Sequence, residues 1–352
     1  MKKKILPAMV GVALACGMTP VVSDVTLFGH IDTSVDAFDV DGGTDDINMN
    51  CTTCSVGFKG SEELGNGLKA IFKLDFQYDT TVRNDGDGVG GLAGDGDNDE
   101  SGLKDRDQWV GLAGGFGQVR IGTISTGYKS HGALVDPLYR TALQGRDRGL
   151  QSPLNSGAGE ELHGRATNTL RWDSVNYSGV RLVAHYTLDS DESDGEDENP
   201  YGVGASYSNG GLLVFGDYMN NDQDTAAMTA GWKVGGRYDM GMFSVMGQFE
   251  DFDDSSSFND DVYLWHLGGT MSMLGVRAYL GFGQGTNDDT NHDYTAWTLA
   301  AMHDFSKRTM IYAGFNEIDC DAGSGATLSA CSDVGPAGGE DDKFSLGLKH
   351  KF

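Results

Sequence analysis

The last nine residues, Phe344-Ser345-Leu346-Gly347-Leu348-Lys349-His350-Lys351-Phe352, decide the fold of this chain. Apolar or aromatic side chains stand at every second position and end on Phe352, and small or charged residues stand between them. A period of two predicts a β-strand with one apolar face. Taken alone, the run also fits an ordinary amphipathic edge strand, so the kind of sheet depends on the rest of the chain.

The same period recurs from residue 24 onward. In 68–78 alternate positions from Ala70 to Tyr78 are apolar, whereas Lys69, Lys73 and Asp75 lie on the opposite face. Segments 165–173, 180–188 and 275–283 divide in the same way. The apolar face would meet a core in a soluble sandwich and lipid in a membrane barrel. The periodicity does not choose between these two folds.

The connections between the strands distinguish a membrane barrel from a soluble sandwich. Seven breaks are short and look like tight turns: 60–67, 114–117, 176–179, 208–211, 238–241, 272–275 and 304–307. Eight are longer, acidic and rich in Gly: 39–52, 80–105, 125–165, 189–199, 220–226, 251–260, 286–293 and 319–341. The two kinds alternate without exception, which is typical of outer-membrane barrels with short periplasmic turns and long external loops. We therefore predict an all-β fold, a sixteen-stranded antiparallel transmembrane β-barrel.

The first 23 residues have the order of a secretory signal peptide. Met1 to Lys4 carries positive charge, 5–18 is mostly apolar, and the small residue Ser23 precedes an expected cut at Asp24. A lipid anchor at Cys16 is the less favoured alternative, because Ala13 stands where such a motif prefers Leu. Residues 24–352 contain no apolar run of the ~18–20 residues that a membrane-spanning helix needs, and we expect them to form the barrel.

The charge and the glycine content of the chain exclude some classes of partner and of fold. The formal net charge is −27, and loss of Lys2, Lys3 and Lys4 with the leader changes it to −30. So acidic a surface excludes nucleic acid, which needs basic patches, and favours cations. The 53 Gly residues disfavour long helices.

Four cysteines remain after the leader, an even number that suggests disulfides in an exported protein. We predict the neighbour pairing, Cys51 with Cys54 and Cys320 with Cys331, among three connectivities. A redox role for Cys51 and Cys54 is less favoured, because no βαβ pattern surrounds them.

Several blocks resemble a known family, the general diffusion porins of Gram-negative bacteria, of the neisserial and β-proteobacterial type. The resemblance rests on residues 25–32, 55–70, 106–112, 116–122, 165–174 and 346–352, which follow one another in family order. It implies a sixteen-stranded barrel, a homotrimer and a long third loop folded into the lumen as a constriction. Thr123 departs from the family, which usually has Arg there.

The terminal apolar residues Phe344, Leu346, Leu348 and Phe352 also resemble the signal that the outer-membrane assembly machinery binds by strand pairing. The last strand should pair with the strand that begins near Asp24, because closure removes both sheet edges.

The third long loop, 125–165, is the candidate functional segment, since loops of this length in compact domains are usually functional. Its acids Asp136, Asp147, Glu160 and Glu161 would face basic wall residues and set a transverse field across the pore. Strand parity selects the basic wall candidates Lys59, Lys69, Lys73, Arg120, Arg165, Arg171 and Arg181. For each of them the alternative is a solvated lumen charge away from the narrowest point.

The sequence gives little support for cofactors or catalysis. Asp95 to Glu100 fails the calcium-loop pattern, because Glu100 stands where Gly is required. We expect no cofactor beyond divalent cations bound loosely at the acidic external loops, including 189–198. No Gly-x-Ser-x-Gly elbow and no Gly-Lys-[Ser/Thr] P-loop occurs.

We therefore predict an outer-membrane channel for passive diffusion of ions and small hydrophilic solutes, with a preference for cations because of the net charge. Its expected partners are two further copies of the chain, outer-membrane lipid and lipopolysaccharide, and the assembly machinery. The alternatives are a substrate-specific channel and a mainly structural or adhesive surface barrel. A barrel-borne enzyme is disfavoured because a nucleophile constellation is missing.

Overall fold

The computed structural model describes residues 23–43, 45–81, 103–156, 164–188, 199–220, 228–254, 260–324 and 328–352. Nearly all of them belong to one antiparallel sheet. The strands are β1 (Ser23–Val40), β2 (Asp46–Cys51), β3 (Ser55–Gly65), β4 (Leu68–Gln77), β5 (Lys104–Gly114), β6 (Gly117–Ser125), β7 (Arg165–Asp173), β8 (Val180–Thr187), β9 (Tyr201–Asn209), β10 (Leu212–Asn220), β11 (Met228–Asp239), β12 (Phe243–Asp254), β13 (Asp260–Met273), β14 (Val276–Asn287), β15 (His292–Asp304), β16 (Thr309–Cys320) and β17 (Gly339–Lys351). The short helical segments are α1 (Gly127–Gly132), η1 (Gly145–Asp147), η2 (Pro153–Asn155), η4 (Ser329–Cys331) and η5 (Gly335–Ala337). Among the described residues, no helix has both the length and the apolar character required to cross a membrane.

The sheet closes on itself through its first and last strands. β1 pairs with β17 from His30 opposite Lys351 to Val40 opposite Asp341. Beyond this ladder, the amide of Phe352 donates to the carbonyl of Gly29 and the amide of Gly29 donates to the carbonyl of Phe352, both at 3.1 Å. The predicted closure is therefore confirmed down to the last residue.

The barrel is sixteen-stranded, as predicted, although the sheet is divided into seventeen strand segments. β2 pairs with β1 at Thr33 to Phe38, and β3 pairs with β1 at Ser23 to His30. β2 and β3 therefore count as one interrupted strand of the barrel. The interruption is the short bulge between them, in which Thr53 has a φ of +52°. A disulfide joins Cys51 to Cys54 across this bulge, and a second joins Cys320 to Cys331.

The two faces of the strands are reversed relative to a soluble protein. In β17, Phe344, Leu346 and Leu348 are 47–50% exposed, whereas Ser345 is fully buried and Lys349 is 6% exposed. Apolar side chains therefore point outward and polar ones inward, which is the arrangement that places lipid outside the barrel and water or polar contacts inside it.

All seven predicted short turns occur where they were expected, at one end of the barrel. Two of the predicted long loops are tight connections instead. β1 runs on to Val40 and β2 begins at Asp46, and β14 and β15 are separated only by residues 288–291. Acidic residues in these segments, such as Asp39 and Asp46, belong to the paired strands, because backbone pairing to a neighbour outweighs their low strand propensity.

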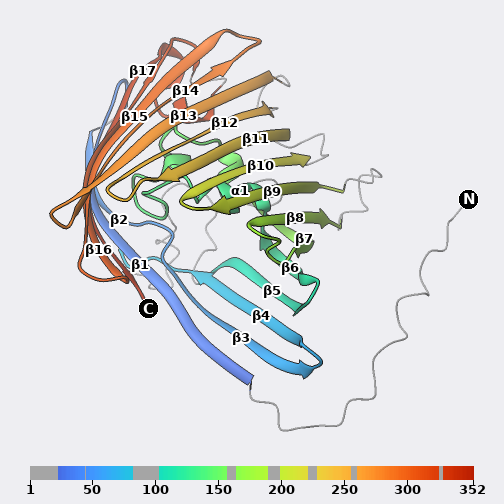
Figure 1. The fold of residues 1–352 in the computed structure, drawn as a ribbon. Helices are drawn as coiled ribbons and strands as arrows, with labels where there is room; N and C mark the ends of the chain where they lie inside the picture. The colour runs from blue at the N-terminus through green and yellow to red at the C-terminus, as the bar shows by residue number, and fades with distance from the viewer. Residues whose placement is uncertain are drawn as a thin grey trace, which may run out of the picture.

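The third long connection, residues 126–164, is called loop 3 here. Figure 1 shows its green segment, which carries α1, inside the ring of strands. Its side chains are buried accordingly, with Val135, Leu138 and Leu154 at 0% exposure. The inward-folded third loop expected from the family resemblance is confirmed.

Barrel closure at Gly29 can be tested by Gly29→Ala. An added Cβ would lie 2.4 Å from the carbonyl oxygen of Ser55 and 2.5 Å from the ring of Phe352. We expect a loss of about 1–3 kcal/mol, the usual cost of overpacking, measured as a lower temperature at which the folded band disappears from a semi-native gel. Gly115→Ala is the control, since a Cβ there meets no atom within 4 Å. Equal unfolding temperatures for the two variants would contradict tight packing at Gly29, where β1 meets the end of the chain.

Candidate functional site

Loop 3 leaves the wall at the end of β6 and turns at once into α1. The hydroxyl of Thr126 accepts a hydrogen bond from the amide of Lys129 at 3.3 Å and so caps the first turn. Apolar residues then recur along the loop, although no regular strand or long helix follows. They are Val135, Leu138, Leu143, Leu150 and Leu154.

These apolar residues pack on one half of the inner wall. Val135, Leu138 and Leu143 form a buried cluster with side chains of β10, β12 and β14–β16: Phe215, Met246, Tyr279, Ala300, Met302 and Tyr312. Leu150 and Leu154 form a second cluster with Phe252, Leu264, Tyr294 and Ile318 among others. Loop 3 therefore covers the inner wall from β10 to β16.

Glycines on this wall make room for the loop. A Cβ added at Gly314 would lie 2.7 Å from Leu143, and one at Gly231 would lie 2.7 Å from Leu154. A Cβ at Gly283 would come within 3.1 Å of Leu150. Part of the high glycine content therefore forms sockets for the loop's leucines.

A buried carboxylate holds the middle of the loop. Glu250 on β12 is fully buried and accepts hydrogen bonds from the hydroxyl of Tyr128 at 2.7 Å, the amide of Ser152 at 3.0 Å and the side-chain amide of Asn155 at 2.9 Å. Lys233 on β11 donates to the carbonyl of Tyr128 and to Asn155 Oδ1, both at 2.6 Å. Because the network satisfies both buried charges, it fixes the loop without leaving an unpaired ion.

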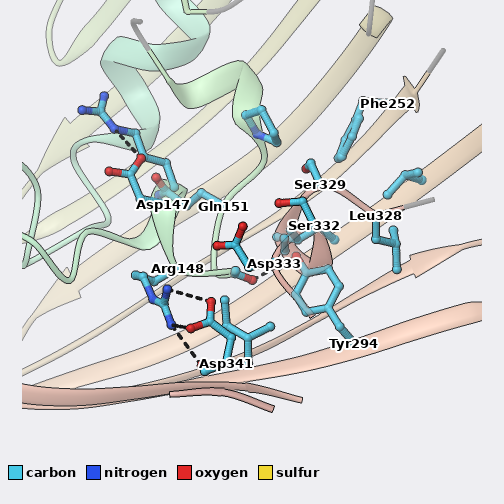
Figure 2. Close-up of a pocket in the computed structure, with 17 residues that line it drawn as sticks. Asp147, Arg148, Gln151, Phe252, Tyr294, Leu328, Ser329, Ser332, Asp333 and Asp341 are labelled. Carbon is cyan, nitrogen blue, oxygen red and sulfur yellow. Dashed lines mark hydrogen bonds and ion pairs between the residues drawn. The ribbon is translucent and has the colours of Figure 1, made fainter. Parts of the chain in front are cut away.

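A second anchor lies nearer the loop end of the barrel. Arg148 donates from Nη1 and Nη2 to the carboxylate of Asp341 on β17, at 2.9 and 3.1 Å, and from Nε to Asn316 on β16 at 2.6 Å. Figure 2 shows this bidentate pair between Arg148 and Asp341, below Asp147. Such a buried Arg–carboxylate fork has strict geometry and so fixes the position of the loop.

The opposite wall, on β4–β7, lies outside the apolar clusters of loop 3 and carries a chain of largely buried ion pairs. Asp107 lies between Lys73 Nζ and Arg165 Nε, each at 2.9 Å. Asp75 lies 3.3 Å from Lys73 and 3.5 Å from Arg106. Further along, Asp173 pairs with Arg120 and Arg171: the latter contact is 2.7 Å. Five basic side chains therefore meet three acidic ones, and this wall has a positive balance.

The edge of loop 3 that faces this wall is also basic. The guanidinium of Arg146 lies 5.1 Å, and that of Arg140 5.6 Å, from the ring centre of Tyr139. Burial, followed by the charges of Arg165 and Arg146, lowers the pKa of the Lys129 ammonium well below its usual range. Burial would raise the pKa of the Tyr139 phenol, yet Arg140 and Arg146 outweigh it and lower that pKa. A phenol with a lowered pKa inside a protein requires a positive local potential.

The predicted acids of loop 3 do not form the expected row opposite the wall. Asp136 is buried within its own turn, where it accepts from the amides of Leu138 and Gly145 at 2.9 Å each. Burial raises its pKa to about 6. Asp147 is half exposed and contacts Gln144 and Arg146. Glu160 and Glu161 lie outside the described residues.

The predicted basic wall residues fall into two groups. Lys73, Arg120, Arg165 and Arg171 belong to the ion-pair chain, and Lys59 stands opposite Lys73 in the β3–β4 ladder. Lys69 pairs with Glu63 near the β3–β4 turn, at 2.5 Å, and Arg181 is exposed on β8 near the turn end. These last two therefore lie away from the narrowest part.

Strand parity missed Arg106 and Asp107 as a pair. The β4–β5 register shifts between Leu74 and Phe76, so a bulge turns both consecutive residues of β5 toward Asp75 and Lys73. The family block at 106–112 was the one signal in the sequence that pointed to this position. Among the described residues, no group of His, Cys, Asp or Glu is arranged to hold a metal ion. The acidic segments expected to bind divalent cations, 80–105 and 189–199, lie largely outside the described residues.

A closed barrel with an inward-folded third loop and ion pairs along its inner wall is the architecture of the outer-membrane porins. The family model described as "Gram-negative porin" matches residues 6–323, and the chain belongs to that family. It is therefore a protein of the outer membrane.

Several known proteins are similar over nearly their whole length. The major outer membrane protein P.IB of Neisseria meningitidis serogroup A is 26% identical over 98% of this chain and 99% of its own, and that of Neisseria lactamica is 25% identical over the same shares. Among solved structures, the anion-selective porin from Comamonas acidovorans has a TM-score of 0.73 at 23% identity and covers 94% of this chain and 100% of its own. The trimer form of OmpT from Vibrio cholerae has a TM-score of 0.66 at 14% identity, over 94% and 99%.

The Arg148 anchor yields a test of loop docking. Asp341→Ala leaves the buried guanidinium of Arg148 without its counter-charge, a change that typically costs about 3–5 kcal/mol. We expect hydrogen exchange of the loop 3 amides to accelerate while the strand amides of β10–β16 keep their protection. Asp304→Ala, which removes an exposed acid 3.6 Å from Arg277, is the control and should have little effect. Unchanged exchange in loop 3 of Asp341→Ala would contradict the anchoring role.

Proposed function

We propose that the chain forms a water-filled channel for passive diffusion of small hydrophilic solutes, with a preference for anions. The observation that carries this proposal is the like sign of the two sides of the passage. Arg106 and Arg165 lie on the wall, and Arg140 and Arg146 lie on loop 3. An anion in the passage meets donors on both sides, and a cation meets like charge.

The preference for cations expected from the net charge is not supported. Much of the acidic charge belongs to sequence segments outside the described strands, such as 189–198, and charges beyond a Debye length of about 10 Å are screened by salt. The charges at the narrowest point therefore have the larger influence on selectivity. That the Comamonas relative is described as anion-selective also favours this sign.

The acids within the basic wall have a role in transport. Asp75, Asp107 and Asp173 hold the basic groups in place and partly neutralise them. A channel conducts only if its sites attract the ion enough to admit it and weakly enough to release it. We infer that the paired acids keep the attraction for anions shallow, so that several successive sites pass the ion along.

The further expectations remain proposals of the same kind. We propose that residues 1–23 are a cleaved signal peptide, that three copies of the chain associate, and that lipopolysaccharide and the assembly machinery are partners. The OmpT relative, whose structure is a trimer form, supports the homotrimer. The family consists of channels, so we propose no enzymatic activity.

The sign of the selectivity can be measured as the zero-current potential of the purified protein in a planar bilayer under a tenfold KCl gradient. We expect a potential of the sign that chloride preference gives. Arg106→Gln combined with Arg140→Gln should lower the chloride-to-potassium permeability ratio by about two- to fivefold, because both sides of the passage lose a charge. Lys307→Gln, in the exposed β15–β16 turn, is the control and should leave the ratio unchanged.

Three results would go against the proposal. A potential of the sign that potassium preference gives would overturn the anion preference. A transport rate that saturates for one solute, but not for other solutes of the same size and charge, would favour a substrate-specific channel. Absence of any conductance would favour a mainly structural barrel.

A further inference from the structure

A cavity of about 200 Å³ separates loop 3 from the connection between β16 and β17, residues 321–338, which we call loop 8. Figure 2 shows Asp147 and Gln151 of loop 3 on one side and Ser329, Ser332 and Asp333 of loop 8 on the other. The Cys320–Cys331 disulfide ties loop 8 to the end of β16. Leu328 and Val334 bury themselves in the same apolar cluster as Leu150, so loop 8 is held inward. The cavity is thus built by two packed loops.

The floor of this cavity is apolar. Phe252 of β12, Leu264 of β13 and Tyr294 of β15 line it, together with Val262 and Ile318. The hydroxyl of Tyr294 already donates to the carbonyl of Gly149 at 3.0 Å, so this ring offers mainly its hydrocarbon surface. The volume is below the ~300–1,000 Å³ of sites for drug-sized ligands. The floor therefore suits a small ligand with an apolar body.

The basic groups in the lining are either paired or inaccessible. All three nitrogens of the Arg148 guanidinium donate to Asp341 or Asn316. Arg146 donates from Nη1 to the carbonyl of Asn155 at 3.0 Å. Its Nε lies 3.7 Å from Asp147 and has no hydrogen-bond partner among the described residues, but this atom is buried and a ligand in the cavity does not reach it. The lining therefore offers an anion few accessible donors.

The acceptors in the lining are not occupied. Asp333 has neither a hydrogen bond nor an ion pair within the part of the chain that the structure describes. Gln151 is 3% exposed and donates its amide to the carbonyl of Gly132 at 2.9 Å, but its own side-chain carbonyl has no donor among those residues. The exposed hydroxyls of Ser329 and Ser332 add two more acceptors. A buried carbonyl without a donor is costly, and a ligand with N–H groups would satisfy it.

We propose that this cavity binds a small organic cation: a primary ammonium group on an apolar chain. The ammonium donates to the Asp333 carboxylate and the Gln151 carbonyl, and the chain lies on Phe252, Leu264 and Tyr294. The site differs in sign from the basic passage, and Arg146 and Asp147 separate the two. Occupancy places a bound solute beside the loop 3 edge, so it reduces the current through the pore in a saturable way.

The test uses n-hexylammonium chloride as the probe and the full-length, disulfide-intact protein in detergent. Calorimetry should give saturable binding, and the same probe added on the loop side of a bilayer should lower the current with the same midpoint. Sodium hexanoate, which has the same chain with an anionic head, should not bind. Asp333→Asn should raise the dissociation constant about three- to tenfold, the loss expected for a charged hydrogen bond at a partly exposed site.

The control is Asp321→Asn, an exposed acid of the same loop that does not line the cavity. It should bind the probe as the unmodified protein does. The proposal is overturned if hexylammonium fails to saturate, if hexanoate binds equally well, or if the two Asn variants bind alike. These results do not depend on the ion preference of the pore, so the two proposals stand or fall separately.

Discussion

The docking of loop 3 on one half of the inner wall is the constraint on which the rest of the channel depends. Its leucines occupy spaces left by glycines such as Gly283 and Gly314, and Glu250 and Arg148 fix its polar backbone. Burial of five large apolar side chains, at roughly 1.5–3 kcal/mol each, stabilises the docked loop. The inner faces of β3–β7 are left outside the apolar clusters that loop 3 forms with the wall.

The charge of the β4–β7 wall follows from the fold and not from the composition of the chain. With loop 3 seated on β10–β16, Glu250 of β12 is buried beneath it, and Asp36 of β1 is buried against Asn50, Lys343 and Ser345 of the neighbouring strands. The wall outside the apolar clusters of loop 3 is the one that carries Arg120, Arg165 and Arg171. A strongly acidic chain therefore has an inner wall on which five basic side chains meet three acidic ones, because the fold gathers basic residues of β4–β7 there.

Much of the fold follows from local sequence. The period of two identifies the face of each strand that meets lipid, and the alternation of short turns with long loops gives the number of strands. The pairing of Phe352 with Gly29 then follows from the need to remove both edges. The site was less predictable. The bulge that brings Arg106 and Asp107 to the same side leaves no mark in an alternating pattern, and the burial of Asp136 depends on the tertiary docking of its loop. The alternation along a strand also could not separate Lys69 and Arg181 from the ion-pair chain. It gives the face on which a side chain lies, but not its position along the barrel axis.

Accessibility of cysteines on the two halves of the inner wall tests the docking of loop 3 most directly. Lys59 on β3 and Ala300 on β15 both point inward, but Lys59 is exposed to the lumen and Ala300 is 3% exposed beneath the loop. A membrane-impermeant methanethiosulfonate should react rapidly with Lys59→Cys and lower its single-channel current, and Ala300→Cys should stay unmodified on the same timescale. Equal reaction rates at the two positions would show that both walls line the pore and would contradict the proposed division of the lumen.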